Sequence, residues 1–337
     1  MYSPHKVYLL YAHESLNVML EDPLVQLLIL IASIVGLASA SHFAIRSIEK
    51  LIEMTGLSDA SAGFIILAVL TSTPEIVVAL FSIIQGTPAI SIGDILGSNV
   101  FNIGMVLGIL GVIGYLKTCS TGLVVELTDM LFITALIPLL LVINQYHIVD
   151  IPSPFIGIIL LATFLINTYI MARKRTPPVR SNDGKAMING KRIVVIATLL
   201  ASFAIVVVSA RLTVYAASNI AIAFGLPPIL IGAKIVAIGT SLPELTLDLT
   251  AVKRGRVQLA LGDIIGSNLT NLTLVLGLVL LTSPFRVDMT IFIEILPFLL
   301  MTTVIFWRFI MRGGISKTGG AVLILTYILF QALVMKV

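Results

Sequence analysis

The chain has 337 residues, of which 58% are hydrophobic and only 11% are charged, and its mean hydropathy is +1.09. A soluble domain carries about 25% charged residues, so this composition excludes an ordinary soluble protein and predicts one that exposes much of its apolar surface to lipid. The formal net charge is +4, and the single cysteine excludes an intrachain disulfide.

The first segment, residues 1–23, is polar and carries both signs of charge. It lacks the short apolar core and cleavage site of a secretory signal, so we expect it to lie outside the membrane. The rest of the chain contains ten stretches of the length and apolar character that a membrane-spanning helix needs. They are residues 24–47, 60–86, 90–116, 122–145, 152–172, 193–218, 227–251, 257–283, 287–311 and 318–336. The predicted fold class is therefore an all-α membrane protein with ten transmembrane helices.

Lysine and arginine are distributed unevenly between alternate loops. If the N-terminus lies outside, sixteen of the 21 basic residues fall in inner loops, four on the outer side, and one, Lys234, within a span. Short positive loops resist translocation, so we expect both termini outside. The basic linker 173–192 is then cytoplasmic and separates a first five-helix unit, 24–172, from a second, 193–337. Because this linker is short, we also expect residence in a prokaryotic cell membrane.

Two motifs occur twice in the chain, with the same separation of 169 residues between copies. The matched segments are 71–75 (TSTPE) with 240–244 (TSLPE), 93–99 (GDILGSN) with 262–268 (GDIIGSN), and Asn102 with Asn271. Five predicted spans separate corresponding points. Because five is odd, the second copy must cross the membrane in the opposite direction. The sequence therefore predicts two inverted repeats, a plan common in secondary transporters whose ion sites lie near the midplane.

The first motif places a proline directly before a glutamate, as Pro74-Glu75 and Pro243-Glu244. Proline lacks an amide donor, and its ring clashes with the carbonyl four residues earlier, so each proline frees a backbone oxygen. The preceding Thr and Ser hydroxyls and the glutamate carboxylate add further oxygens, which are the ligands that hard cations such as Ca²⁺ prefer. An acid within a membrane span is functional by default, so these segments are predicted to bind a cation.

The glutamates also suggest why transport would be coupled. Glu75 and Glu244, facing each other across the repeat, would repel one another without a cation between them. One divalent ion balances both charges, and so do two monovalent ions or protons. Because the empty site is too unfavourable to reorient through the membrane, we expect obligatory exchange.

The second motif supplies neutral oxygens. Ser98 and Asn102 are four residues apart and share a helical face, as do Ser267 and Asn271, so they can complete the shell around an ion. The alternative is close helix packing with interhelical hydrogen bonds. The glycines of the motif favour such close approach in either case.

Five further charged residues in the spans have open roles. Asp94 and Asp263 are expected either to cap a helix N-terminus or to line the inner ion entrance. Asp248 is expected at a solvent-exposed helix end, and the alternatives are a proton carrier or a part of the inner ion pathway. Lys234 and Glu294 are predicted to lie at similar depth and to form an ion pair between the seventh and ninth spans.

Residues 237–244 (AIGTSLPE) and 266–268 (GSN) resemble the signatures of the calcium/cation antiporter superfamily, specifically its sodium/calcium exchanger branch. The resemblance covers essentially the whole chain. It implies a secondary active antiporter that exchanges Ca²⁺ for Na⁺ by alternating access, in which spans 24–47 and 193–218 slide past a fixed core. The ion ligands that it implies are Thr71, Ser72, Glu75, Ser98, Asn102, Thr240, Ser241, Glu244, Ser267 and Asn271, with backbone carbonyls of Ala68 and Ala237.

One departure from that family leaves the counter-ion open. Similar sodium exchangers often place an aspartate at the position of Asn102 or Asn271, whereas this chain has asparagine at both. With only two carboxylates in the shell, a two-for-one exchange or a Ca²⁺/H⁺ antiporter becomes the alternative. A cation channel is the alternative of another class, because acids and carbonyls also form selectivity filters.

The expected partners are Ca²⁺, a monovalent cation and the lipid bilayer. We expect no tightly bound cofactor, no nucleic acid and no obligate protein partner. Enzymatic catalysis is not expected, because the sequence has no recognisable nucleophile–base set or cofactor motif.

Overall fold

A computed structural model of the chain describes residues 22–55, 71–146, 151–173, 189–283 and 288–334. Every regular element in these ranges is helical, including three π-helical segments labelled η. The elements are α2 (Pro23–Thr55), α5 (Thr73–Ile84), α6 (Pro88–Phe101), η2 (Asn102–Val106), α7 (Leu107–Ile113), α8 (Gly122–Leu136), α9 (Leu139–Gln145), α10 (Ser153–Arg173), α11 (Asn189–Phe224), α12 (Pro228–Ile231), η3 (Gly232–Val236), α13 (Ala237–Thr240), α14 (Leu242–Lys253), α15 (Val257–Thr270), η4 (Asn271–Val275), α16 (Leu276–Thr282), α17 (Met289–Met311) and α18 (Lys317–Leu333).

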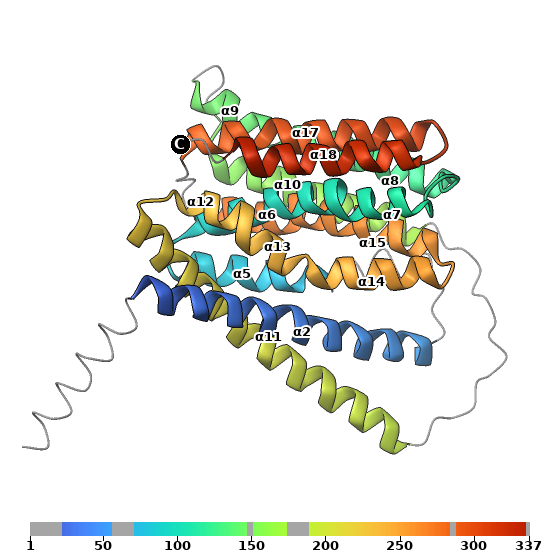
Figure 1. Cartoon of the computed structure of the whole chain (residues 1–337), viewed down its shortest axis with the longest axis horizontal. Coiled ribbons are helices and arrows are strands. Elements are labelled where there is room, and N and C mark those ends of the chain that lie inside the picture. The colour runs from blue at the N-terminus through green and yellow to red at the C-terminus, as the bar shows by residue number, and fades with distance from the viewer. Residues whose placement is uncertain (1–21, 56–70, 147–150, 174–188, 284–287, 335–337) are drawn as a thin grey trace, which may run out of the picture.

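The predicted all-helical membrane class is confirmed. Eight helical stretches in the described ranges are long and apolar enough to cross a membrane. The shorter apolar helices α5 and α18 occupy two further predicted spans, and residues 60–70 of the second predicted span lie outside the described residues. The helices lie roughly along one common direction (Figure 1), as expected for helices that cross the same bilayer. Lipid requires every backbone polar group to be satisfied within the protein, and this favours the helical conformation.

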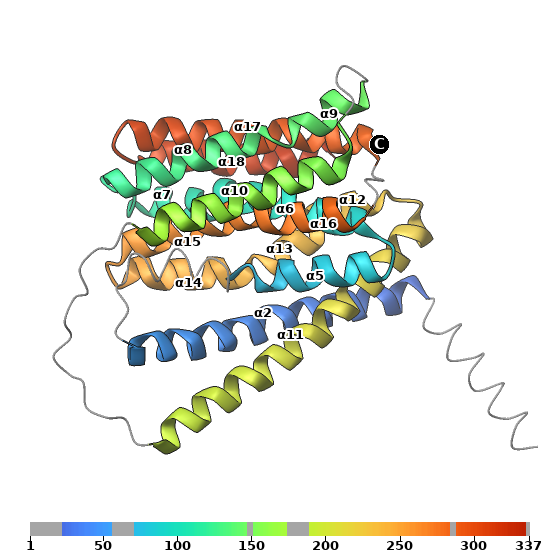
Figure 2. The same cartoon turned by 180° about the vertical axis from the view of Figure 1, so that it is seen from behind.

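Helices α2 and α11 form a pair at one edge of the bundle, visible from both sides (Figures 1 and 2). They pack mainly against each other, and Thr213 of α11 donates a hydrogen bond to Ser33 of α2 over 2.9 Å. Only 28% of the apolar window of α2 and 22% of that of α11 is buried. The pair is therefore a peripheral unit whose outer face is apolar.

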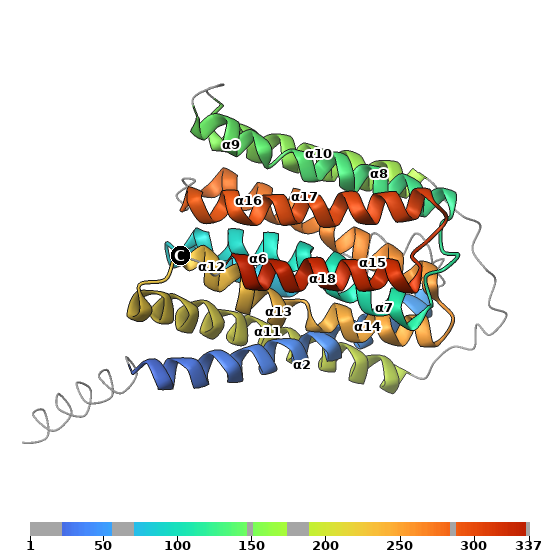
Figure 3. The same cartoon turned by 45° about the horizontal axis from the view of Figure 1, so that its top comes forward.

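The centre of the bundle is formed by two stretches that are each 83% buried, Pro88–Ile113 and Val257–Thr282 (Figure 3). The first packs directly against the backbone of α12 and η3. A Cβ atom added at Gly93 would lie 2.0 Å from the carbonyl oxygen of Ile229, and one at Gly97 would lie 2.2 Å from that of Ala233. These glycines let the two helices approach to backbone contact, as predicted from the motif.

Gly93→Ala is therefore expected to destabilise the protein by about 1–3 kcal/mol, the usual range for overpacking a close contact. The atom in the way belongs to the backbone of a neighbouring helix and cannot rotate aside. Thermal unfolding of the purified protein in detergent measures the effect. Gly122→Ala is the matched control, because an added Cβ at Gly122 meets nothing within 4 Å; equal Tm values for the two variants would contradict the packing argument.

The predicted ion pair between Lys234 and Glu294 is wrong. The Lys234 ammonium, in η3, donates instead to the backbone carbonyl of Gln331 in α18 over 2.5 Å. It also lies 5.9 Å from the ring centroid of Phe330, and one carboxylate oxygen of Glu294 has no hydrogen-bond partner. Equal depth did not make the two residues neighbours, because α18 provides the nearer acceptor for Lys234.

Candidate cation-binding site

The helix that carries Glu244 is interrupted just before it. Helix α13 ends at Thr240, and α14 begins at Leu242 with Pro243 in its first turn. Between them Ser241 has φ −92° and ψ 4°, in the sparsely populated bridge region. Ser72 takes the matching conformation, φ −75° and ψ 6°, directly before α5. Both TS-x-PE motifs thus place their glutamate in the first turn of a new helix.

The two glutamates are fully buried and lie near one another. Both Glu75 and Glu244 have 0% exposure, and neither carboxylate has a hydrogen-bond partner. Glu75 lies near the side chains of Thr240 and Ser241 from the second repeat, and Glu244 lies near Glu75. Two acids from segments 169 residues apart therefore share one water-excluded region.

A hydroxyl network surrounds this region and joins the two halves of the chain. The hydroxyl of Thr71 donates to Oδ1 of Asp263 over 3.0 Å and lies 2.7 Å from that of Ser267. Ser72 is on the same segment, and its hydroxyl reaches the backbone carbonyl of Ser267 over 3.5 Å. The first motif of one half is thus bonded to the second motif of the other.

The reciprocal contacts are also present. The hydroxyl of Thr240 donates to Oδ1 of Asp94 over 2.9 Å and lies 3.2 Å from that of Ser98. The backbone carbonyl of Ala237 accepts a bond from the amide of Ser241 over 3.2 Å and lies 3.5 Å from the hydroxyl of Ser98. The pairs Thr71–Asp263 and Thr240–Asp94 thus occupy corresponding positions in the two copies of the repeat.

The two asparagines that were predicted as ligands each begin a π-helical segment. Asn102 begins η2 and Asn271 begins η4. Nδ2 of Asn102 donates to Oδ1 of Asn268 over 3.2 Å, whereas neither polar atom of the Asn271 side chain has a partner. Single-turn π segments are rare and occur frequently at functional sites. Nothing in the helix pattern of the sequence signalled them.

Three aspartates take positions that sequence reasoning missed. Asp94 and Asp263 are fully buried and lie well inside α6 and α15 rather than at their N-termini, so the capping interpretation is wrong. Asp248 is also fully buried and lies beside Asp263, so it is not at a wetted helix end. The only available signal was that Asp94 and Asp263 belong to the repeated motif.

All predicted ligands in the described ranges are fully buried at 0% exposure. They are Thr71, Ser72, Glu75, Ser98, Asn102, Ala237, Thr240, Ser241, Glu244, Ser267 and Asn271. Ala68 lies outside the described residues. The structure thus places these predicted ligands in the interior of the bundle. The hydrogen bonds described above connect several of them across the two halves of the chain.

Several oxygens in this interior have no hydrogen-bond partner. They belong to both glutamates, to the hydroxyl of Ser241, and to the side-chain carbonyls of Asn102 and Asn271. A buried polar atom without a partner costs about 1–3 kcal/mol, and a buried charge costs more. A cation bound among these oxygens would remove that penalty and offset the repulsion between the two carboxylates.

The oxygens fit a hard cation better than a soft one. Ca²⁺ takes six to eight oxygen ligands, which can be carboxylates, amide carbonyls and hydroxyl oxygens. Among the described residues, no three His, Cys, Asp or Glu side chains form a cluster that could hold a metal ion. A cation here would therefore depend on neutral oxygens in addition to the carboxylates.

Comparison with known proteins gives concordant results. The profile of the family described as "Sodium/calcium exchanger protein" matches residues 25–173 and 194–336. The sodium/calcium exchanger MaX1 of Methanosarcina acetivorans is 28% identical over 91% of this chain and 97% of its own length. The putative antiporter CaxA of Alkalimonas amylolytica is 28% identical over 90% and 97%, respectively. The fold is similar to that of the sodium-calcium exchanger NCX_Mj, with a TM-score of 0.64 at 24% identity over 92% of this chain and 99% of that one.

Proposed function

Because the chain belongs to the sodium/calcium exchanger protein family, we propose that it is a secondary antiporter that exchanges Ca²⁺ for Na⁺ across the membrane. The ions bind between the two TS-x-PE segments, near the membrane midplane. The ligands are those predicted from the sequence, with Glu75 and Glu244 as the charged members.

The observation that carries this proposal is the pair of buried glutamates. Glu75 and Glu244 come from different halves of the chain, have 0% exposure and lack hydrogen-bond partners. Two neighbouring carboxylates in a water-excluded region are unfavourable unless cations balance them. The empty protein therefore resists reorientation, and one ion can leave only when another replaces it.

The arrangement of helices supports alternating access by two inverted repeats. Helix α2 runs from left to right in Figure 1, whereas α11, its counterpart in the second half, runs from right to left. This pair is peripheral and packs mainly against itself, so it can slide past the buried core without separating α6 from α12. The proposal includes ten spans, with α5 and α18 crossing as shorter helices, both termini outside and the 173–192 linker in the cytoplasm.

A Na⁺ gradient is expected to drive Ca²⁺ transport. Proteoliposomes loaded with Na⁺ and diluted into Na⁺-free buffer at equal pH should accumulate ⁴⁵Ca²⁺ above the level of protein-free liposomes. Vesicles with a pH gradient and no Na⁺ serve as the parallel arm. If ⁴⁵Ca²⁺ uptake occurs only with the pH gradient, the counter-ion is H⁺ and not Na⁺.

The same assay separates an antiporter from a channel. A channel would carry Ca²⁺ into vesicles that contain neither Na⁺ nor a pH gradient, whereas obligatory exchange would not. The H⁺ alternative rests on the sequence, because Asn102 and Asn271 add no carboxylate to the pair of glutamates. Two protons can neutralise two carboxylates as effectively as one Ca²⁺.

A further inference from the structure

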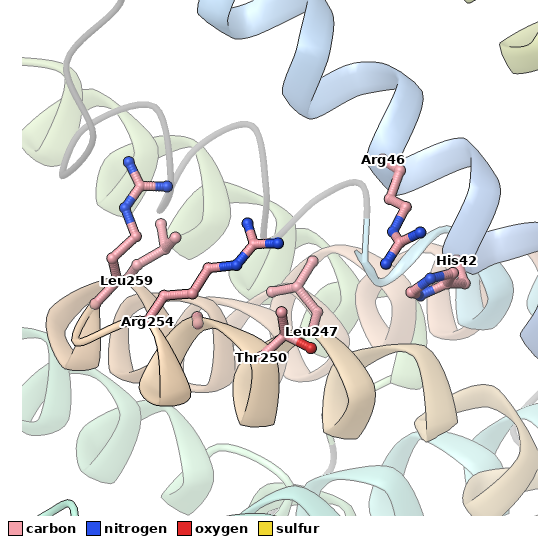
Figure 4. A pocket seen from close by; sticks show the side chains of 8 residues that line it. His42, Arg46, Leu247, Thr250, Arg254 and Leu259 are labelled. Carbon is pink, nitrogen blue, oxygen red and sulfur yellow. The ribbon is translucent and has the colours of Figure 1, made fainter.

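A pocket that is partly open to solvent lies toward the ends of α2 and α14 (Figure 4). His42 and Arg46 of α2 line one side, and Arg254, which directly follows α14, lines another. In Figure 4 the side chains of Arg46 and Arg254 approach the space above Leu247 and Thr250 from opposite directions. The pocket is thus formed by one helix of the peripheral pair and by the helix that carries Glu244.

The lining of this pocket is basic at the rim and apolar at the base. Its charged members among the described residues are the arginines Arg46, Arg254 and Arg256, and no acid is among these described lining residues. Leu247 at the base is 8% exposed, and Arg46 and Arg254 are exposed. Arginine presents a planar fork of donors that matches the oxygens of a phosphate. The lining therefore suits a ligand with a phosphate at one end and apolar atoms at the other.

The position of the pocket selects the source of that phosphate. The membrane-spanning window of α2 ends at Ala40, two residues before His42, and α14 ends at Lys253, one residue before Arg254. Taking these apolar windows as the membrane spans, we infer that the basic side chains lie just beyond them, at the depth of lipid headgroups. Basic pockets between transmembrane helices at this depth bind the headgroups of anionic lipids.

We propose that this pocket binds an anionic phospholipid, with Arg46 and Arg254 contacting the headgroup phosphate and Leu247 and Leu259 contacting its apolar part. The bound lipid bridges α2 to the end of α14. The proposal goes beyond ion exchange and does not depend on which cations are transported, because the pocket does not include the buried glutamates.

The test uses the purified full-length protein and phosphatidylglycerol as the probe, with zwitterionic phosphatidylcholine as the comparison lipid. Native mass spectrometry should show phosphatidylglycerol retained on the protein, and thermal unfolding in detergent should show a higher Tm with that lipid than with phosphatidylcholine. The double variant Arg46→Gln/Arg254→Gln should weaken phosphatidylglycerol binding by at least about tenfold, since two charge-assisted contacts are lost.

Arg312→Gln is the matched control. Arg312 is an exposed arginine at the end of α17 that does not line the pocket, so this variant should bind phosphatidylglycerol like the wild type. The substitutions in the double variant and in the control are all at exposed side chains. Tm values equal to that of the wild type in phosphatidylcholine will show that both variants are folded.

Three results would overturn the proposal. The first is equal binding of the two lipids by the wild type. The second is unchanged phosphatidylglycerol binding by the double variant. The third is that millimolar inorganic phosphate displaces phosphatidylglycerol and raises the Tm of the protein as much as the lipid does. That result would assign the pocket to a soluble anion.

Discussion

Glu75→Gln and Glu244→Gln are each expected to abolish Ca²⁺ exchange while leaving the protein folded. Glutamine has nearly the same shape but lacks the charge, so the remaining carboxylate cannot balance a divalent ion by itself. The loss should exceed the roughly 10–100-fold that follows from removing an outer-shell partner of a metal site. Removing a buried, unpartnered charge also relieves a desolvation penalty, so the Tm without Ca²⁺ should stay the same or rise.

The measurement is Na⁺-driven ⁴⁵Ca²⁺ uptake in proteoliposomes, with thermal unfolding in the presence and absence of Ca²⁺ as a second readout. Wild-type protein should be stabilised by Ca²⁺, because a ligand that binds only the folded state raises its stability, and both variants should lose that response. Glu294→Gln is the control, since it removes an acid from a different helix. If either Glu75→Gln or Glu244→Gln transports Ca²⁺ as well as the wild type, the substituted glutamate is not part of the site.

Asp94→Ala is expected to raise the Ca²⁺ concentration needed for half-maximal transport by about 10–100-fold, the usual effect of losing a second-layer partner. Oδ1 of Asp94 accepts a hydrogen bond from the hydroxyl of Thr240 over 2.9 Å and another from the hydroxyl of Ser98 over 3.4 Å. It therefore orients two of the proposed neutral ligands, which come from opposite halves of the chain. Without it, both hydroxyls lose their carboxylate acceptor and can turn toward the carbonyl of Ala237 instead, so their oxygens lose the orientation that a cation requires.

Asp94→Asn separates positioning from a purely structural role. The amide oxygen still accepts a hydrogen bond, so this variant should recover part of the Ca²⁺ affinity that alanine loses. Asp129→Ala is the control, because Asp129 accepts a bond from the indole of Trp307 over 2.7 Å between α8 and α17. That variant should lower the Tm without changing the Ca²⁺ dependence. A wild-type Ca²⁺ dependence for Asp94→Ala would reject the positioning role.

The extent of several helices was available from the sequence alone, whereas α2 (Pro23–Thr55) and α11 (Asn189–Phe224) extend beyond the predicted stretches 24–47 and 193–218. The predicted stretch 257–283 corresponds to Val257–Thr282, and 287–311 corresponds to Met289–Met311. Hydrocarbon leaves a spanning segment no backbone conformation but a helix or a closed barrel, so a run of apolar residues determines the element directly. The repeated motifs were also evident, because two segments and the gap between them recur at one separation.

The partners of the buried charges were decided only by the tertiary structure. Asp94 and Asp263 were predicted as possible helix caps because they fall near the start of their predicted spans, yet each accepts a hydrogen bond from a threonine hydroxyl of the opposite half of the chain. Lys234 was matched to Glu294 by depth and instead bonds to the backbone of α18. Hydropathy gives the depth of a residue along its own helix, but not the rotation of that helix or its neighbours, and contact energies in the bundle depend on both.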